Sequence, residues 1–426
     1  MASDAIPAAT RHPFAYRDYR FYWFARLATM LGQMSMVIII GWQVYDIARQ
    51  TMGLRAAALQ LGYVGMVQFV PLLLLTLVVG WTADRVDRRW IARAAVLLEA
   101  VCALSLAWLT WSGTVTLTSL FIVAGLLGVA RAFASPALQA LAPNLVPVAV
   151  LPAAIAMSSL AWQGGAIVGP ALGGYLYVLS PAAPYAASTV LFLIAFAGLM
   201  MIRPVPRASI AAGTNPWAQM IEGLRYVRRN RLVLGAISLD LFAVLLGGAT
   251  ALLPVFARDV LHIGPAGLGH LRAAPAAGAA LTALLLAYRP LKTNVGNKML
   301  VAVAIFGAAT VVFGLSRYEL LSLACLALLG SADMLSVYVR QSLIQIYTPD
   351  AMRGRVGAVS TLFISASNEL GEAESGFLAA VIGPVAAVVG GGIGAIAVTL
   401  LWAKWFPELR HARSFTPPDN LENGSV

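Results

Sequence analysis

The sequence is poor in charge, in cysteine and in histidine. Only 11% of its 426 residues are charged, and it has two cysteines and four histidines. A soluble fold of this length needs more polar surface to stay dispersed, since globular domains contain about 25% charged residues. Cys102 and Cys325 each stand alone, without the spacing of a metal site or a redox pair. We therefore expect neither a metal site nor a disulfide.

The common signatures of enzymes are also missing. The sequence has no GxSxG, no HExxH and no phosphate-binding GxxxxGK[ST] pattern, so it predicts neither a hydrolase, a metalloprotease nor a nucleotide-hydrolysing protein. We expect a protein that is not an enzyme and that carries no cofactor.

Long apolar stretches make up most of the chain, which is 60% hydrophobic. A helix needs roughly 20 mostly apolar residues to cross a bilayer, and the stretches of that length are separated by short polar loops. They predict an all-α integral membrane protein with twelve spans in two six-helix bundles. The predicted spans are 21–45, 57–80, 90–112, 117–140, 154–179, 183–202, 233–257, 266–287, 299–315, 319–345, 357–380 and 384–405.

The positive charges are distributed unevenly between the two sides of the membrane. The net charge is +11, but only Arg49, Arg55, Arg258 and Arg317 fall in loops on one side. The positive-inside rule then places both termini in the cytoplasm. No basic patch lies on a soluble module, so we expect no nucleic-acid partner. The first twenty residues lack the apolar core of a signal peptide.

Weak internal repetition divides the chain into two halves. Leu61 in LGYVGMVQ aligns with Leu268 in LGHLRAAP, and Val86 in VDRR aligns with Val295 in VGNK. Repeats of this kind are typical of transporters whose substrate site lies at the bilayer midplane. The predicted parts are a cytoplasmic tail (1–20), an N-terminal bundle (21–202), a cytoplasmic linker (203–232), a C-terminal bundle (233–406) and a second tail (407–426).

Three stretches carry a resemblance to a known family. They are GWTADRVDRR between spans two and three, GAIVGPALGG in span five, and TPDAMRGRV with SNELGEAESG around span eleven. With them the chain resembles the major facilitator superfamily, and within it the bacterial multidrug and siderophore efflux branch, which includes exporters of enterobactin. The resemblance implies the twelve-helix fold of that family, a location in the bacterial inner membrane, and export.

The loop between spans two and three resembles the gating loop of that family. Asp87 is a departure, since the family motif has glycine there. Span eleven starts on the cytoplasmic side. The N-terminus of a helix carries a partial positive charge, which stabilises a nearby carboxylate by about 0.3 to 1 kcal/mol. The resemblance places Asp84 beside that start, as a latch between the halves; the alternative is that the loop only fixes topology. The predicted gating-loop residues are Gly80, Asp84, Arg85, Arg88 and Arg89.

Span five contains a stripe of glycines at spacings of four. Small residues at this spacing let two helices approach closely, and a proline loosens the backbone. The stripe predicts a helix-packing seam, and the family resemblance associates it with export. The predicted packing residues are Gly165, Gly169, Pro170, Gly173 and Gly174.

Several charged residues lie inside the apolar spans. Each costs at least about 2.5 to 3.5 kcal/mol at the bilayer centre unless it is paired or hydrated, so we expect them to line a water-filled cavity. A carboxyl group in low dielectric also holds its proton more tightly, which suits proton coupling. We expect proton carriage by Asp240 and Glu369 first and then by Glu372, with Arg131 and Arg340 favouring anionic or polar substrate groups. A salt bridge between Asp333 and Arg340 is the alternative for that pair. The predicted cavity residues are Asp240, Glu369, Glu372, Arg131, Arg340, Asp333 and Arg272.

Together these features predict a secondary transporter that exchanges protons for a small amphipathic molecule, such as a drug or a siderophore, by alternating access. The expected partners are the substrate, protons and the lipid bilayer, and we expect a monomer. Three alternatives stay open: an importer, a lysolipid flippase, and a membrane receptor or scaffold that transports nothing.

Overall fold

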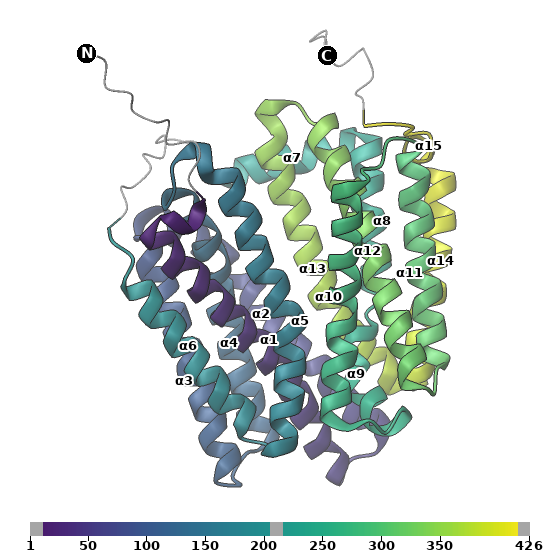
Figure 1. Ribbon diagram of the computed structural model, residues 1–426. Coiled ribbons are helices and arrows are strands. Elements are labelled where there is room, and N and C mark those ends of the chain that lie inside the picture. Colours follow the sequence, from purple (N-terminus) through teal and green to yellow (C-terminus); the bar gives the residue numbers. More distant parts are fainter. Residues whose placement is uncertain (1–11, 205–215, 416–426) are drawn as a thin grey trace, which may run out of the picture. The chain divides into compact units, whose positions relative to one another are not determined.

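The computed structural model describes residues 12–204 and 216–415, and all regular structure in these ranges is helical (Figure 1). The outer parts of the predicted tails and residues 205–215 of the predicted linker lie outside the described residues. The helices are α1 (Arg17–Thr51), α2 (Leu54–Arg85), α3 (Arg88–Trp111), α4 (Leu117–Leu141), α5 (Leu151–Leu179), α6 (Ala183–Met200), α7 (Pro216–Arg229), α8 (Arg231–Leu246), α9 (Leu253–Val255), α10 (Gly264–Tyr288), α11 (Val295–Leu315), α12 (Glu319–Tyr347), α13 (Asp350–Ile382), α14 (Pro384–Trp405) and α15 (Pro407–Arg410).

Polar caps start several of the long helices. The side chain of Thr116 accepts from the Ser119 N–H at 3.2 Å and the side chain of Ser119 accepts from the Thr116 N–H at 2.9 Å, a capping box that begins α4. Asn230 accepts from the N–H of Val233 at 3.1 Å at the start of α8. Each cap satisfies an N–H that the helix itself leaves unpaired.

The twelve predicted spans correspond to α1–α6, to the segment from α8 to residue 260, and to α10–α14. Eleven of these, within the described residues, are long and apolar enough to cross a membrane. The twelfth is α13, whose 33 residues are ample in length but include three glutamates and two arginines that lower its hydropathy. The predicted all-helical membrane fold is confirmed.

The seventh span is not one continuous helix. We predicted a span over 233–257, but α8 ends at Leu246, and a 3-10 turn (Ala249–Leu252), the short α9 and a π-helical turn (Phe256–Val260) follow. Gly247 and Gly248 mark the break. An added Cβ on Gly247 would meet the ring of Phe306 on α11, so close packing requires glycine here.

The contacts divide the chain into two compact units, which we describe separately. Unit 1 is Met1–Thr51, Met66–Ile210 and Ile263–Ala273. Within it α1 packs along α5 and α6, and α3 packs against α4 and α6. The hydroxyl of Tyr19 on α1 donates to the carbonyl of Ala154 on α5 at 2.6 Å, and Tyr22 and Ser158 share a hydrogen bond of 3.1 Å. These bonds hold the first turns of α1 against α5.

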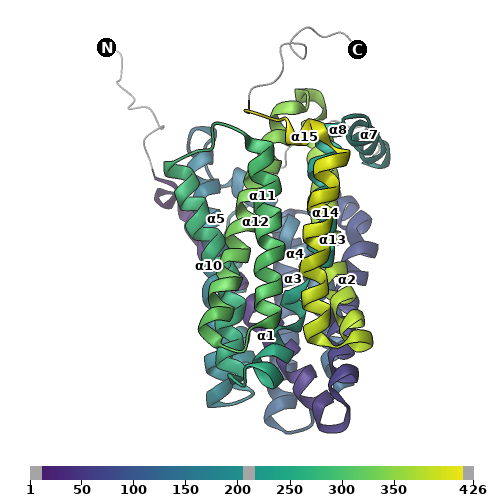
Figure 2. The same ribbon diagram turned by 90° about the vertical axis from the view of Figure 1, so that its right-hand side faces the viewer.

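Unit 2 is Met52–Gly65, Ala211–His262 and Ala274–Val426. Figure 2 shows α14 running beside α11, which also packs against α12, while α8 packs against α13 and α14. The amphipathic α7 lies on α13, where Glu222 pairs with Arg355 at 2.9 Å. The unit boundaries fall inside α2 and α10, so parts of these two helices are assigned differently from the predicted halves.

Candidate functional site

The acid of the seventh span pairs with an arginine from another helix. Asp240 on α8 forms an ion pair through Oδ2 with Nη1 of Arg340 on α12. Asp240 is 5% exposed and Arg340 2% exposed. A single charge in hydrocarbon costs several kcal/mol, so each of these side chains makes the burial of the other tolerable.

A small cavity lies beside this pair in unit 2. Its lining includes Asp240, Phe306, Asp333 and Ser336, and its volume is about 10 Å³. A water molecule needs roughly 10 to 15 Å³ by the same measure, so the cavity has room for one water at most. We predicted that the charged groups line a water-filled cavity; Asp240 and Arg340 are both buried, Asp240 lines this small cavity, and their roles in proton coupling stay predictions.

The Asp240–Arg340 ion pair also concerns the predicted alternative of a salt bridge between Asp333 and Arg340. Asp333 and Arg340 are seven residues apart on α12, a rise of roughly 10.5 Å along a helix. Side chains three or four residues apart meet on a helix, and those two turns apart do not. In the part of the chain that the structure describes, the ion pair recorded for Arg340 is with Asp240, so Asp333 lines the cavity without that pairing.

The remaining predicted cavity residues are spread over both units. Glu369 and Glu372 lie on α13 in unit 2, where both are partly exposed and both take part in side-chain interactions. Arg272 lies in the part of α10 that belongs to unit 1 and is also partly exposed. Their predicted roles in proton coupling stay predictions.

A second buried polar cluster lies in unit 1, and its acid was missed. Glu99 on α3 is fully buried, and its Oε1 accepts from Nε2 of Gln33 on α1 at 2.5 Å. Arg131 on α4 donates to Oε1 of Gln68 on α2 at 3.0 Å and interacts electrostatically with Glu99. The sequence signal was available, because Glu99 lies inside predicted span three and the rule applied to Asp240 singles it out equally.

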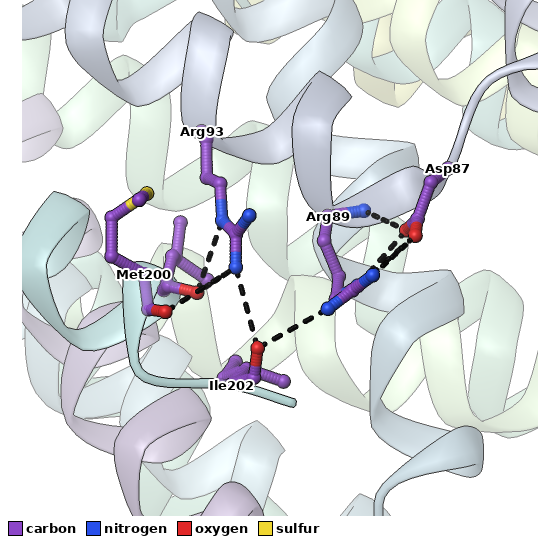
Figure 3. A network of polar contacts seen from close by, with 6 residues as sticks. Asp87, Arg89, Arg93, Met200 and Ile202 are labelled. Carbon is purple, nitrogen blue, oxygen red and sulfur yellow. Dashed lines mark hydrogen bonds and ion pairs between the residues drawn. The ribbon is translucent and has the colours of Figure 1, made fainter. Parts of the chain in front are cut away.

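Arg89 of the predicted gating loop, and Arg93 four residues further along α3, bind backbone carbonyls at the end of α6 and just after it (Figure 3). Arg89 reaches both Asp87, at 2.6 Å, and the carbonyl of Ile202, at 3.3 Å. Arg93 donates to the carbonyls of Leu199, at 2.9 and 3.2 Å, and Met200 in the last turn of α6, and to that of Ile202 just after it. Carbonyls at the end of a helix lack intrahelical partners, and cations stabilise them.

Two further residues of the loop join it to adjacent helices. Arg88 donates to the carbonyl of Ala140 near the end of α4 at 3.2 Å. Asp87 caps α3 by accepting from the N–H of Arg89 at 2.9 Å, which gives the departure from glycine a structural role. Gly80, Asp84 and Arg85 lie on α2, in a part of the helix whose side chains are outside the described ones. The latch therefore stays a prediction.

The glycine stripe of α5 faces two different helices. A Cβ added at Gly165 or Gly169 would lie 2.5 or 2.7 Å from the Cβ of Met30 or Met34 on α1, and one at Gly173 would lie 2.7 Å from Oγ of Ser35. Gly174 instead faces the backbone of Pro265 on α10, and the carbonyl of Pro170 approaches Gly269. The first three glycines therefore allow the close contact of α5 with α1.

Comparison with known proteins gives one family and two sets of relatives. The family model described as transmembrane secretion effector matches residues 8–420. The enterobactin exporter EntS of Citrobacter koseri is 28% identical over 412 residues, covering 94% of this chain and 95% of the relative. EntS of Escherichia coli K12 is 27% identical over 410 residues, covering 94% of each chain.

Solved structures share the fold at low identity. The POT family transporter PepTSo matches with a TM-score of 0.71 and 13% identity, covering 94% of this chain and 99% of that one. A D-xylose-proton symporter matches with a TM-score of 0.69 and 14% identity, covering 92% and 99%. The family and its relatives are transporters and not enzymes, as the missing catalytic motifs predicted. This membrane protein therefore belongs to the transmembrane secretion effector family of the major facilitator superfamily, a family of transporters.

Proposed function

We propose that the protein exports a small amphipathic compound from the cytoplasm in exchange for protons, by alternating access. The observation that carries the proton coupling is the buried ion pair between Asp240 on α8 and Arg340 on α12. The family match and the exporter relatives support export and a location in the bacterial inner membrane. The excess of arginine and lysine in the loops on one side supports cytoplasmic termini.

The pair provides a way to couple a proton to a movement of two helices. When Asp240 takes up a proton it loses its charge, and Arg340 is left as a buried charge without a counter-ion. Leaving one partner of a buried pair uncompensated costs about 3 to 5 kcal/mol. The protein can recover this energy only if α8 and α12 move so that Arg340 reaches water or an anionic group. Proton uptake therefore favours a different arrangement of the helices.

The break in the seventh span supports a movement at this place. Asp240 lies seven residues before Gly247, where α8 ends and the irregular turns begin. Discontinuous spanning helices commonly form the substrate and ion sites of transporters, and residues at the end of an element can absorb a hinge movement. We expect α8 to pivot at Gly247 when the ion pair opens.

The chemistry of the substrate follows from the same cluster and from the relatives. An arginine freed from Asp240 would attract an anionic or phenolic oxygen, and apolar helices around it would accept aromatic rings. EntS is named an exporter of enterobactin. We therefore propose an aromatic compound with acidic or phenolic groups, of which a catecholate siderophore is one example.

The test measures transport into inside-out membrane vesicles with an imposed pH gradient, using enterobactin as the first probe. Uptake should require the gradient in the unaltered protein and should lose its gradient dependence in Asp240→Asn. Glu408→Gln is a matched control, because Glu408 also pairs with an arginine, Arg231 at 2.7 Å, but at an exposed site. Gradient-driven uptake by Asp240→Asn at the unaltered rate would refute the role of Asp240.

Import is the second candidate, since a proton symporter shares the fold. The two directions are separated by the sign of the flux: an exporter fills inside-out vesicles when their interior is acidic, whereas a symporter empties them. A receptor or scaffold would give no gradient-dependent flux of any substrate tested.

A further inference from the structure

The amphipathic helix α7 lies across the end of unit 2. Figure 1 shows it from the side, transverse to the start of α13, and Figure 2, turned by 90°, shows it end-on. A Cβ added at Gly223 would lie 2.8 Å from the carbonyl oxygen of Arg355 and 3.1 Å from the side chain of Val359. We predicted that span eleven begins at residue 357, so α7 crosses α13 at the predicted boundary between cytoplasm and lipid.

One face of α7 is fixed to unit 2. Val227 is 2% exposed and packs into a buried apolar cluster of this unit. The hydroxyl of Tyr226 donates to the carbonyl of Tyr347, the last residue of α12, at 2.8 Å, and Glu222 pairs with Arg355 at 2.9 Å. These contacts hold α7 against the end of α12 and the first turns of α13.

The opposite face of α7 exposes apolar and basic side chains together. Ile221 is 52% exposed and Leu224 is 40% exposed, and Arg225 and Arg228 are exposed beside them. Residues three or four apart share a face of a helix, so these four side chains form one outer strip. Neither arginine forms a hydrogen bond or an ion pair with a residue that the structure describes.

The outer strip fits the boundary region of a bilayer with anionic headgroups. There, apolar side chains leave water for the upper part of the acyl chains, and arginines bind the phosphates just above it. A soluble anion would leave Ile221 and Leu224 in water, and pure hydrocarbon would leave both arginines without a counter-ion. The one acid in the sequence of α7, Glu222, pairs with Arg355, so the strip presents positive charge.

We propose that the outer strip of α7 binds anionic phospholipids of the cytoplasmic leaflet. Arg225 and Arg228 bind the headgroup phosphates, and Ile221 and Leu224 lie among the first carbons of the acyl chains. The bound lipid holds α7 at the level of the headgroups and thereby fixes the ends of α12 and α13 to which α7 is bonded. This surface goes beyond the proposed export, because it needs neither a transported substrate nor a proton.

The test attaches a fluorophore to α7 and measures its quenching by spin-labelled lipids. Cys102 and Cys325 are both buried, so a maleimide dye reacts with the cysteine introduced by Arg229→Cys, at an exposed position beside the strip. The labelled full chain is placed in phosphatidylcholine nanodiscs. These contain increasing fractions of either phosphatidylglycerol or phosphatidylcholine with a spin label near the top of one acyl chain.

Phosphatidylglycerol should reach half-maximal quenching at a lower fraction than phosphatidylcholine. An arginine near an anionic surface contributes about a factor of five in affinity, so two arginines give a preference of roughly 25-fold. Arg225→Gln combined with Arg228→Gln should abolish this preference. High salt should also weaken it, because the strip is exposed and its charges are screened.

The matched control is Arg289→Gln combined with Lys292→Gln, which removes two exposed positive charges from another loop that we predict to be cytoplasmic. It should keep the preference, and so should Asp240→Asn, which separates this proposal from the proposed proton coupling. Ile221→Ser combined with Leu224→Ser should weaken the quenching by both lipids. The proposal is overturned if both lipids quench equally, if the control loses the preference too, or if millimolar inorganic phosphate or an acidic peptide removes the quenching.

Discussion

The Asp240–Arg340 pair allows one prediction to be worked through in energies. Asp240→Asn leaves the guanidinium of Arg340, 2% exposed, without its counter-ion. Removing one partner of a buried pair costs about 3 to 5 kcal/mol, whereas replacing both with residues of similar volume is often neutral. We therefore expect Asp240→Asn and Arg340→Met each to destabilise the protein by several kcal/mol. The double variant should be no less stable than either single variant.

The assay is a double-mutant cycle on the free energy of unfolding, measured by titrating the protein in mixed micelles with a denaturing detergent. The interaction energy should be about 3 kcal/mol, well above the roughly 0.6 kcal/mol average for polar side-chain pairs in membrane helices. The exposed Arg231–Glu408 pair is the control, and it should give about 1 kcal/mol or less. The reasoning would be refuted if the changes in unfolding free energy of the two single variants added up to that of the double variant, or if the interaction energy were near 0.6 kcal/mol.

Three further predictions concern the helix contacts and the gating loop. Gly169→Val should lower the yield of folded protein, because the valine side chain would collide with α1. Gly164→Val should be tolerated, because a Cβ added there lies 3.7 Å from its nearest neighbour. Arg93→Gln should lose the hydrogen bonds to Leu199 and destabilise the end of α6 by about 1.5 to 3 kcal/mol, seen as faster amide exchange there; unchanged exchange argues against the cap. Asp84→Asn should insert normally but transport more slowly, and export at the unaltered rate would contradict the latch.

The positions of the spans could be read from the sequence, because hydropathy is a property of each segment by itself. The predicted start of α4 at residue 117 and the predicted ends of α12 and α14 lie within two residues of the structure. The break at Gly247 was missed, since an apolar stretch containing two glycines satisfies the length and hydropathy criteria with or without a continuous helix.

The candidate site was only half predictable. Listing the charges inside the spans identified Asp240, Arg340 and Arg131 as individuals, because each is costly in lipid wherever it lies. The same rule applied evenly would have added Glu99. The partners could not be read in this way, since Asp240 and Arg340 are far apart in the sequence and lie on different helices.

The sequence by itself thus determined that this chain is a multi-pass membrane protein, where its apolar spans lie, and which charged groups fall inside them. These properties depend on local composition and on the cost of placing charge in hydrocarbon. Only the tertiary structure decided that Asp240 pairs with Arg340 across α8 and α12, that Arg89 and Arg93 bind the end of α6, and that Gln33 binds Glu99 while Gln68 binds Arg131. Each of these contacts depends on which helices pack together and on how each is rotated about its axis, which no single segment specifies.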